Sequence, residues 1–455
     1  MTTYFAAHAL LPAGAATDVR LTVEGDRITA VESHGHLHIG DVVLPGVVLP
    51  GLANTHSHAF HRALRGRVQA GRPDEGHGNF WTWRRQMYGV AGRLTPDSYL
   101  ALARATYAEM VISGTTAVGE FHYLHHTPAG RRYSDPNAMG EALTHAAADA
   151  GIRLTLLDAL YLAGGLSGEG HVPLDSHQRR FSDGSVDAWA ERMAARREGL
   201  GKLPRVTLGA AVHSVRAVPH DALAAAAQAV DALDPGQPLH VHLSEQPAEN
   251  VAAQVHYGRT PTQLLAEAGV LRPSLTAVHA THLTDDDITL LADAEAMASF
   301  CPTTERDLAD GIGPARALAD AGVHLTLGSD QHSVIDPFEE MRGLEMHERL
   351  LTGERCRFTP EELLETASAE GYRSLGVPDG GALAAGRLAD FVVVRDDTVR
   401  TIGARPAQIL YAATAADVDT VVVGGQVVVE RGEHVRLGPV APLFRDALDL
   451  MREGG

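Results

Sequence analysis

The sequence predicts an α/β protein with two parts, a (β/α)8 TIM barrel and a small β-sandwich domain built from both chain termini. Three observations predict this fold. Short apolar runs alternate with longer helical patterns from Leu49 onward, β-rich segments lie near both ends of the chain, and polar residues gather where the apolar runs end. We therefore expect residues 1–48 and 380–455 to form the small domain and residues 49–379 to form the barrel.

The small domain is predicted from β patterns near the two termini. Its expected strands cover residues 18–23, 27–31, 41–44, 389–395 and 418–430. Glu24-Gly25-Asp26 and the Gly424-Gly425 pair are tight-turn signals between such strands. We expect strands from the two ends to pair with one another, and a last helix over residues 442–451.

The barrel is predicted from eight strand-like runs over about 280 residues, close to the ~250 residues that such barrels usually need. The runs end near His56, Glu120, Asp158, His213, His242, His279, Thr304 and Asp330. The clearest helical patterns cover residues 98–113, 139–150, 186–200, 219–233, 337–351 and 360–375. Because active sites of these barrels form at the carboxyl ends of the strands, the polar residues there are candidate functional residues.

Composition narrows the possible functions. The 455 residues carry a formal net charge of −19, which repels phosphate backbones and argues against a nucleic-acid partner. No apolar run reaches ~18 residues, so we expect no membrane span, and no basic segment leads into an apolar one near residue 1, so we expect a cytoplasmic protein. Cys301 and Cys356 are the only cysteines, so a metal site must use imidazoles and carboxylates.

A metal centre is predicted at the ends of the strands. His56 and His58 are two residues apart at a strand end and therefore share one face. The pair alone is weak, since buried structural histidines are common, but His242 and Asp330 end two other strands at the same rim. Three imidazoles and one carboxylate suit Zn²⁺ with room for a water. Glu245 is placed to take a proton from that water and later deliver it to a leaving group.

These residues resemble the amidohydrolase superfamily along nearly the whole chain, and His242-Leu-Ser-Glu245 is similar to the His-x-x-Glu of its deaminase branch. Within that branch the sequence resembles the formimidoylglutamate deiminases of histidine degradation. The stretches that carry this resemblance are Asn54-Thr-His-Ser-His-Ala-Phe-His-Arg62, Phe80-Trp-Thr-Trp-Arg84, Gly119-Glu-Phe-His-Tyr-Leu-His-His126, Val212-His-Ser-Val-Arg216, Cys301-Pro-Thr-Thr-Glu305 and Gly328-Ser-Asp330.

The resemblance implies a role for each matching residue. It assigns the metal to His56, His58, His242 and Asp330, proton transfer to Glu245, and orientation of the water to His279, with Asp330 also acting in catalysis. Substrate contacts would be His61, Arg84, Tyr123, His213 and Arg216. The family commonly has Gln at the position of His61. Relatives with two metals bridge them with a lysine that ends a strand, whereas Lys202, the only lysine, precedes the fourth strand, so we expect one zinc ion.

The substrate implied is N-formimino-L-glutamate, a dicarboxylate that would be hydrolysed to N-formyl-L-glutamate and ammonia. Arg84 and Arg216 are forked donors matched to its two carboxylates. The resemblance also implies a homodimer. Two alternatives stay open: a related deaminase acting on a purine or similar amidine, and a barrel without catalysis that serves as a scaffold. We interpret His122, His125 and His126 as loop residues near the pocket, not as a second metal cluster.

Overall fold

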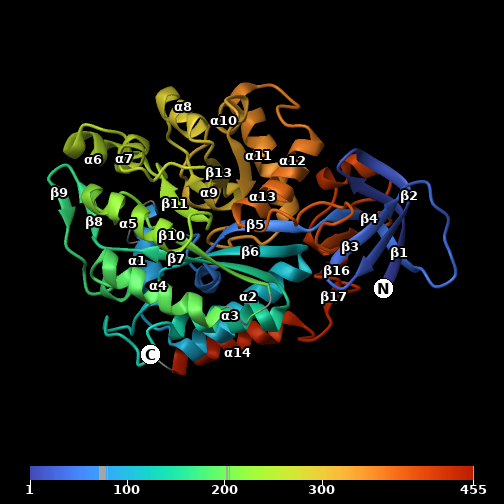
Figure 1. The fold of residues 1–455 in the computed structure, drawn as a ribbon, viewed down its shortest axis with the longest axis horizontal. Coiled ribbons are helices and arrows are strands. Elements are labelled where there is room, and N and C mark those ends of the chain that lie inside the picture. The colour runs from blue at the N-terminus through green and yellow to red at the C-terminus, as the bar shows by residue number, and fades with distance from the viewer. Residues whose placement is uncertain (71–77, 79, 201–202, 204, 454–455) are drawn as a thin grey trace.

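Eight parallel strands form a barrel beside a separate sheet in the computed structural model, which describes residues 1–70, 78, 80–200, 203 and 205–453. Figure 1 shows the barrel wrapped by helices, with the small sheet at one side. The predicted barrel and the small β domain from both termini are confirmed. Lys202 lies outside the described residues, so its expected place before the fourth strand stays a prediction.

The barrel strands follow one another in chain order around the sheet. They are β5 Leu52–Ser57, β6 Thr115–His122, β7 Arg153–Leu160, β10 Val206–Val212, β11 Leu239–Leu243, β12 Leu275–His279, β13 Met297–Phe300 and β14 His324–Leu327. Every residue of β6 and β7 is buried, as expected for parallel strands covered on both faces. A parallel bridge between Ser57 and Asp330 closes the barrel between its first and last strands.

The barrel helices cover the outside of these strands (Figure 1). They are α2 Pro96–Ile112, α3 Ala138–Ala150, α4 Val186–Leu200, α5 His220–Leu233, α6 Pro247–Tyr257, α7 Pro261–Glu267, α8 Asp285–Asp293, α9 Pro302–Leu308, α10 Ala315–Asp320, α11 Pro337–Thr352, α12 Pro360–Ala367 and α13 Ala369–Ser374. Thr95, Thr260, Thr284 and Thr359 begin four of them with capping boxes, which satisfy backbone N–H groups that the first turn leaves free.

Shorter elements sit at the mouth of the barrel. They are the 3-10 helices η1 Ala59–Leu64 and η2 Gln178–Phe181, the helix α1 Phe80–Ala91, and the hairpin of β8 Gly165–Ser167 with β9 Gly170–Val172. Two further 3-10 helices, η3 Pro406–Tyr411 and η4 Ala415–Asp417, lie outside the mouth. None of the helices within the described ranges is both long and apolar enough to cross a membrane.

The small domain is one mixed sheet of eight strands in the order β18-β17-β16-β15-β4-β1-β2-β3. Its strands are β1 Thr2–Leu11, β2 Gly14–Glu24, β3 Arg27–Glu32, β4 Val42–Pro50, β15 Phe391–Val394, β16 Val418–Val423, β17 Gln426–Glu430 and β18 Glu433–His434. The small domain is therefore one continuous sheet instead of the expected sandwich. An antiparallel bridge joins Arg27, at the start of β3, to Leu388, which precedes β15. As predicted, strands from both termini pair, through β4 and β15.

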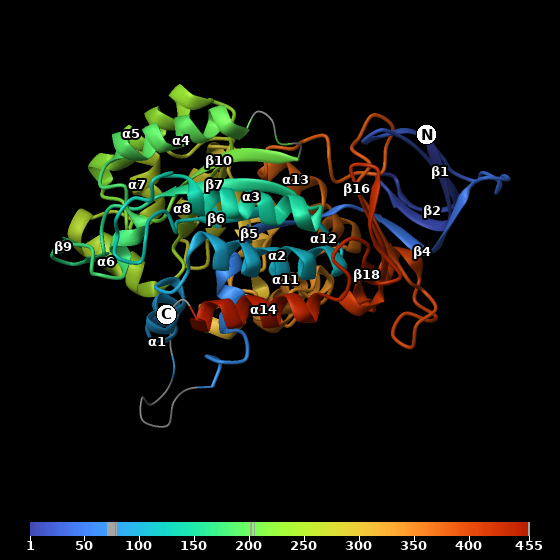
Figure 2. The same cartoon turned by 90° about the horizontal axis from the view of Figure 1, so that it is seen from below.

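A buried aspartate joins the sheet to the barrel. Asp390 accepts two hydrogen bonds from the Arg153 guanidinium, at 2.5 and 3.0 Å, and one from the Tyr372 hydroxyl at 2.7 Å. We keep the division into residues 1–48 with 380–455 and residues 49–379 as a proposal. The last helix, α14 Val440–Glu453, which that division counts with the sheet, packs along α2 of the barrel (Figure 2).

Some predicted element ends were wrong. The seventh strand ends at Phe300, not near Thr304, because Pro302 begins α9 and brings Thr304 into that helix. The single helix expected over residues 360–375 is two helices, α12 and α13, which meet at Ser368 in a non-helical conformation. Glu120 and Asp158 lie two residues before the ends of β6 and β7.

Candidate active site

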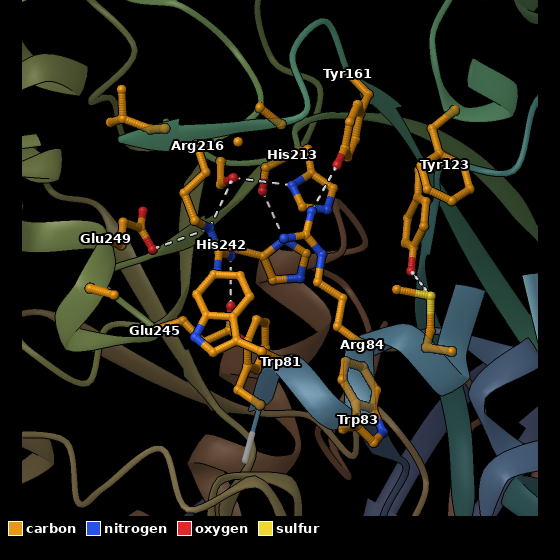
Figure 3. A pocket seen from close by; sticks show the side chains of 18 of the residues that line it. Trp81, Trp83, Arg84, Tyr123, Tyr161, His213, Arg216, His242, Glu245 and Glu249 are labelled. Atoms are coloured by element: carbon orange, nitrogen blue, oxygen red, sulfur yellow. Dashed lines mark hydrogen bonds and ion pairs between the residues drawn. The ribbon is translucent and has the colours of Figure 1, made fainter. Parts of the chain in front are cut away.

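A cavity of about 280 Å³ opens at the carboxyl ends of the barrel strands, where the sequence predicts the site. It is lined by side chains from the strand ends, from α1 and from the β8–β9 hairpin. Figure 3 shows Arg216 and Glu245 to the left of Arg84, with the Trp81 ring drawn over Glu245 in this view. All the residues that the sequence assigns to metal, substrate or catalysis line this cavity except His56, which lies beneath it.

The predicted metal ligands converge on one point. The Nε2 atom of His242 lies 3.1 Å from that of His56 and 3.4 Å from that of His58, and Asp330 Oδ1 lies 3.5 Å from both His56 Nε2 and His58 Nε2. A tetrahedral ion with ligand distances of about 2.0–2.1 Å needs ligand atoms about 3.3–3.4 Å apart. The four side chains therefore have the spacing of a zinc site.

The hydrogen bonds behind these rings support a cation. His58 Nδ1 donates to the Phe121 carbonyl at 2.9 Å and His242 Nδ1 donates to the His213 carbonyl at 2.8 Å, because a carbonyl can only accept. In the neutral rings, both Nε2 atoms therefore present lone pairs to each other. A cation between them removes this repulsion, so the residues fit a metal ion.

Burial keeps these groups in the required protonation state. It lowers the pKa of His58 to about 3 and those of His56 and His242 well below the usual value, so all three rings are neutral at pH 7. Burial also raises the pKa of Asp330 to about 7. A divalent ion would offset that effect by stabilising the carboxylate.

The backbone is strained at two of these positions. His279 and Asp330 adopt positive φ values of +68° and +42° at the ends of their strand segments. Such conformations cost of order 1–3 kcal/mol for residues other than glycine and occur preferentially at functional sites. Here the strain turns both side chains toward the centre of the barrel mouth.

Glu245 and His279 lie beside the predicted metal ligands. Glu245 Oε1 is 3.9 Å from His279 Nε2, and His279 Nδ1 donates to Glu305 Oε1 at 3.4 Å. Glu305, in α9, is in turn fixed by the Cys301 backbone N–H at 2.7 Å. Burial disfavours the charged form of His279, but the hydrogen bond to Glu305 and the nearby carboxylates outweigh it and raise its pKa to about 10. His279 is therefore oriented and positively polarised toward the cavity.

Arg216 binds two carboxylates of the protein. Its Nη2 donates to Glu245 Oε2 at 2.6 Å, and its Nε lies 3.5 Å from Glu249 Oε2 (Figure 3). Burial opposes the charged form of Glu245, but Arg216 outweighs it and lowers the pKa of that carboxyl. Burial raises the pKa of Glu249 to about 7. A ligand carboxylate that pairs with Arg216 would therefore share its guanidinium with these two acids.

Arg84 reaches the cavity from the opposite side. Its guanidinium stacks on two rings, 5.5 Å from Trp81 and 5.2 Å from Tyr88, and donates to the Tyr161 hydroxyl at 3.4 Å. Within the described ranges no carboxylate lies at ion-pair distance from Arg84.

The remaining predicted substrate contacts form one aromatic wall. His61 Nε2 lies 3.2 Å from the Tyr123 hydroxyl, and the Tyr123 ring is edge-on to His213, 5.5 Å between centroids. His61 and Tyr123 are buried, His213 is partly buried, and all three line the cavity. His61 can present only one ring nitrogen to a ligand at a time, whereas the glutamine common at this position offers both a donor and an acceptor.

Sequence reasoning missed the roles of Glu249 and Glu305. Glu305 belongs to one of the stretches that carry the family resemblance, but nothing in that stretch indicates its hydrogen bond with His279. The only sequence signal for Glu249 is its position four residues after Glu245, which does not place it against an arginine from another loop.

The second histidine cluster is a structural ion-pair network. Nitrogens of His122 and His125 and an oxygen of Asp158 lie within 4.8 Å of one another, a spacing that would suit a metal. However, Arg192 donates to both oxygens of Asp158, at 2.6 and 2.7 Å, so its carboxylate is already neutralised. Its guanidinium would also repel a cation. These histidines are buried instead of lying in an open loop.

Comparison with known proteins identifies the family. Residues 47–428 match the Amidohydrolase family. The chain is 38% identical to a formimidoylglutamate deiminase of Pseudomonas aeruginosa over 95% of this chain and 96% of that one. An amidohydrolase of Brucella melitensis superposes with a TM-score of 0.90 at 32% identity, covering 99% and 100% of the two chains. An adenosine deaminase of Xanthomonas campestris with bound zinc has the same fold, with a TM-score of 0.83 at 22% identity and 100% and 98% coverage. The chain therefore belongs to the amidohydrolase family.

Proposed function

We propose that the protein hydrolyses N-formimino-L-glutamate to N-formyl-L-glutamate and ammonia, as a step in histidine degradation. The observation that carries this proposal is the pair of arginines, Arg84 and Arg216, on opposite sides of a cavity that ends on the histidine–aspartate cluster. Two guanidinium groups suit a dicarboxylate better than a neutral purine. The identity of 38% to the Pseudomonas aeruginosa deiminase supports the same substrate.

The proposed cofactor is one zinc ion per chain, held by His56, His58, His242 and Asp330. When bound, zinc supplies a Lewis acid and lowers the pKa of a coordinated water toward 7. The single-ion stoichiometry follows the expectation that no strand-end lysine is available to bridge a second ion.

The side chains of the site divide the remaining work. The arginines hold the two carboxylates and so place the formimino carbon beside the ligand cluster. Water adds to the carbon of the cationic formimino group, and Glu245 takes a proton from the water and gives it to the terminal nitrogen. Ammonia leaves as the C–N bond breaks, and the second proton of the water is released as the formyl carbonyl forms. His279, held by Glu305, orients the attacking oxygen. The surrounding rings exclude bulk water and strengthen these charge interactions.

The test is ammonia release from N-formimino-L-glutamate by the zinc-loaded protein, against a panel of adenine and guanine compounds. We expect Arg84→Met to lower kcat/KM about 10- to 100-fold, because charge-assisted hydrogen bonds contribute about 1.5–3 kcal/mol. Arg85→Met is the matched control, since Arg85 is exposed on the same helix. Faster deamination of a purine, or equal losses in the two variants, would refute the proposal.

We further propose that the protein is a cytoplasmic homodimer, on the family resemblance. Light scattering of the zinc-loaded protein should give twice the 48.3 kDa of one chain. A mass of one chain at micromolar concentration would contradict the dimer without affecting the proposed reaction.

A further inference from the structure

The barrel closes through the residues that flank its metal ligands. The backbone N–H groups of Ser329 and Asp330 donate to the His56 carbonyl at 3.2 and 2.9 Å, and the His58 N–H donates to the Asp330 carbonyl at 3.1 Å. Gly328 permits this approach, because a Cβ atom there would lie 2.7 Å from that of His56. We call this contact between the end of β5 and the segment after β14 the seam.

A chain of buried side chains runs behind the seam. The Ser57 hydroxyl is 2.6 Å from Glu120 Oε2 and 3.1 Å from His332 Nε2. His332 Nδ1 lies 2.9 Å from the Ser329 hydroxyl, to which Asn54 Nδ2 donates at 2.7 Å. Asn54 Oδ1 accepts from the Ser329 backbone N–H at 3.0 Å. All five residues are at most 6% exposed.

The chain is fully satisfied in its hydrogen bonds. Each serine hydroxyl has one neighbour that can donate to it and one that can accept from it, and His332 uses both ring nitrogens. Burial lowers the pKa of His332 well below its usual value, so the ring is neutral and donates from only one nitrogen. Such a complete buried network fixes the segments that carry it.

The ring of His332 connects the two sides of the seam. His332 is the link between Ser57, which stands between two metal ligands on β5, and Ser329, which immediately precedes the third on the opposite side of the seam. It adopts a positive φ of +60°, and its carbonyl accepts from Arg65 Nε at 2.5 Å, so both its backbone and its ring are held. Its ring does not line the cavity.

We propose that His332 is a positioning residue for the metal centre, which holds the histidine pair of β5 and the aspartate of the opposite side at ligand spacing. The inference rests on the proposed function only for the choice of zinc as the ion. Residues that orient metal ligands in this way typically contribute 10- to 100-fold to metal affinity.

The experiment measures zinc release from the holoenzyme into a chromogenic chelator and the zinc affinity of the refilled protein. We expect His332→Ala and Ser329→Ala each to weaken zinc binding about 10- to 100-fold. Ser329→Ala removes a single oxygen, so it tests the same link with little change in packing. The control is His240→Ala, because His240 is an equally buried histidine near the start of β11, bonded to the Ser374 carbonyl at 3.2 Å.

Urea unfolding of the zinc-free proteins separates positioning from general stability. A structural role alone would lower the unfolding midpoint and leave zinc affinity unchanged, which would overturn the proposal. Equal loss of zinc affinity in His240→Ala would overturn it as well. Ammonia release by the wild-type protein is scored separately, so failure of the proposed reaction would be seen even if His332 controls zinc affinity.

Discussion

Replacing Arg192 by methionine should destabilise the protein strongly, because this arginine neutralises two buried aspartates. Arg192 Nη1 and Nη2 bind Asp158 at 2.6 and 2.7 Å, and its Nε and Nη2 bind Asp183 at 3.0 and 2.9 Å. All three side chains are at most 3% exposed. Methionine fills much of the volume but leaves both carboxylates without their cation.

The expected loss is about 3–5 kcal/mol in the free energy of unfolding at pH 7, the usual cost of removing one partner from a buried ion pair. In the variant, Asp158 would still accept the hydrogen bond from the Trp189 indole N–H at 3.1 Å, and Asp183 would still lie 3.2 Å from His126. We therefore expect a loss in the lower half of that range. For 455 residues, an unfolding entropy of about 2.1 cal/mol/K per residue makes each kcal/mol worth about 1 °C in Tm.

The penalty should shrink at low pH. Burial opposes ionisation of Asp183, but His126 and Arg192 outweigh it and lower the pKa of that carboxyl below its usual value. A lowered pKa contributes stability above the unfolded pKa that is lost as pH falls. In Arg192→Met, the two carboxylates can instead protonate, so the difference from wild type should be smaller at pH 4.5 than at pH 7.

Urea unfolding followed by tryptophan fluorescence and circular dichroism measures this loss. Arg197→Met is the matched control on the same helix, because Arg197 pairs at 2.7 Å with Asp234 while both side chains are about 40% exposed, and such pairs contribute at most about 1 kcal/mol. Zinc content should be unchanged in both variants. Equal losses in the two variants would refute the reasoning, and a gain of zinc in Arg192→Met would mean that the second histidine cluster can bind metal.

Three further outcomes follow from the structure. Asp390→Asn should cost about 3–5 kcal/mol in urea unfolding, because it leaves the buried Arg153 without its carboxylate; a loss below 1 kcal/mol would contradict the role of this pair in joining the sheet to the barrel. Burial raises the pKa of Glu120 to about 8, so its contribution to stability is lost as pH rises from about 4.5 through 8. Wild type should therefore lose a few kcal/mol more than Glu120→Gln between pH 5 and pH 8.5, and parallel pH profiles of stability would disprove this. His242→Ala should reduce bound zinc well below one ion per chain by mass spectrometry, and full retention would exclude His242 as a ligand.

The sequence predicts those parts of the fold and site that depend on local patterns. The helix expected over residues 186–200 coincides with α4 Val186–Leu200. The proposed ligands His56, His58, His242 and Asp330 can be expected to meet because each lies at or near the end of a barrel strand, and the topology brings all strand ends together.

Residues whose roles depend on contacts between distant segments could not be predicted. Glu249 meets Arg216 only because the loop after β10 folds against the start of α6. The role of His332 depends on its ring lying between Ser57 and Ser329, and no spacing in the sequence reveals that neighbourhood. The error at Thr304 has a different cause, since a proline that ends one apolar run also suits the first turn of a helix.

Three of the four proposed ligands lie at or just after the ends of the first and last barrel strands, and this placement has a structural reason. Neighbouring barrel strands pair over three to seven residues, whereas within the described ranges β5 and the segment after β14 share one bridge. The backbone pairing of the sheet therefore constrains the relative position of neighbouring segments least at the seam. A buried hydrogen-bond chain contributes a constraint there, and a metal ion bound by side chains from both sides would add another. Closing the barrel and aligning the ligands are therefore achieved by the same contacts, so a change that opens the seam also disperses the ligand set.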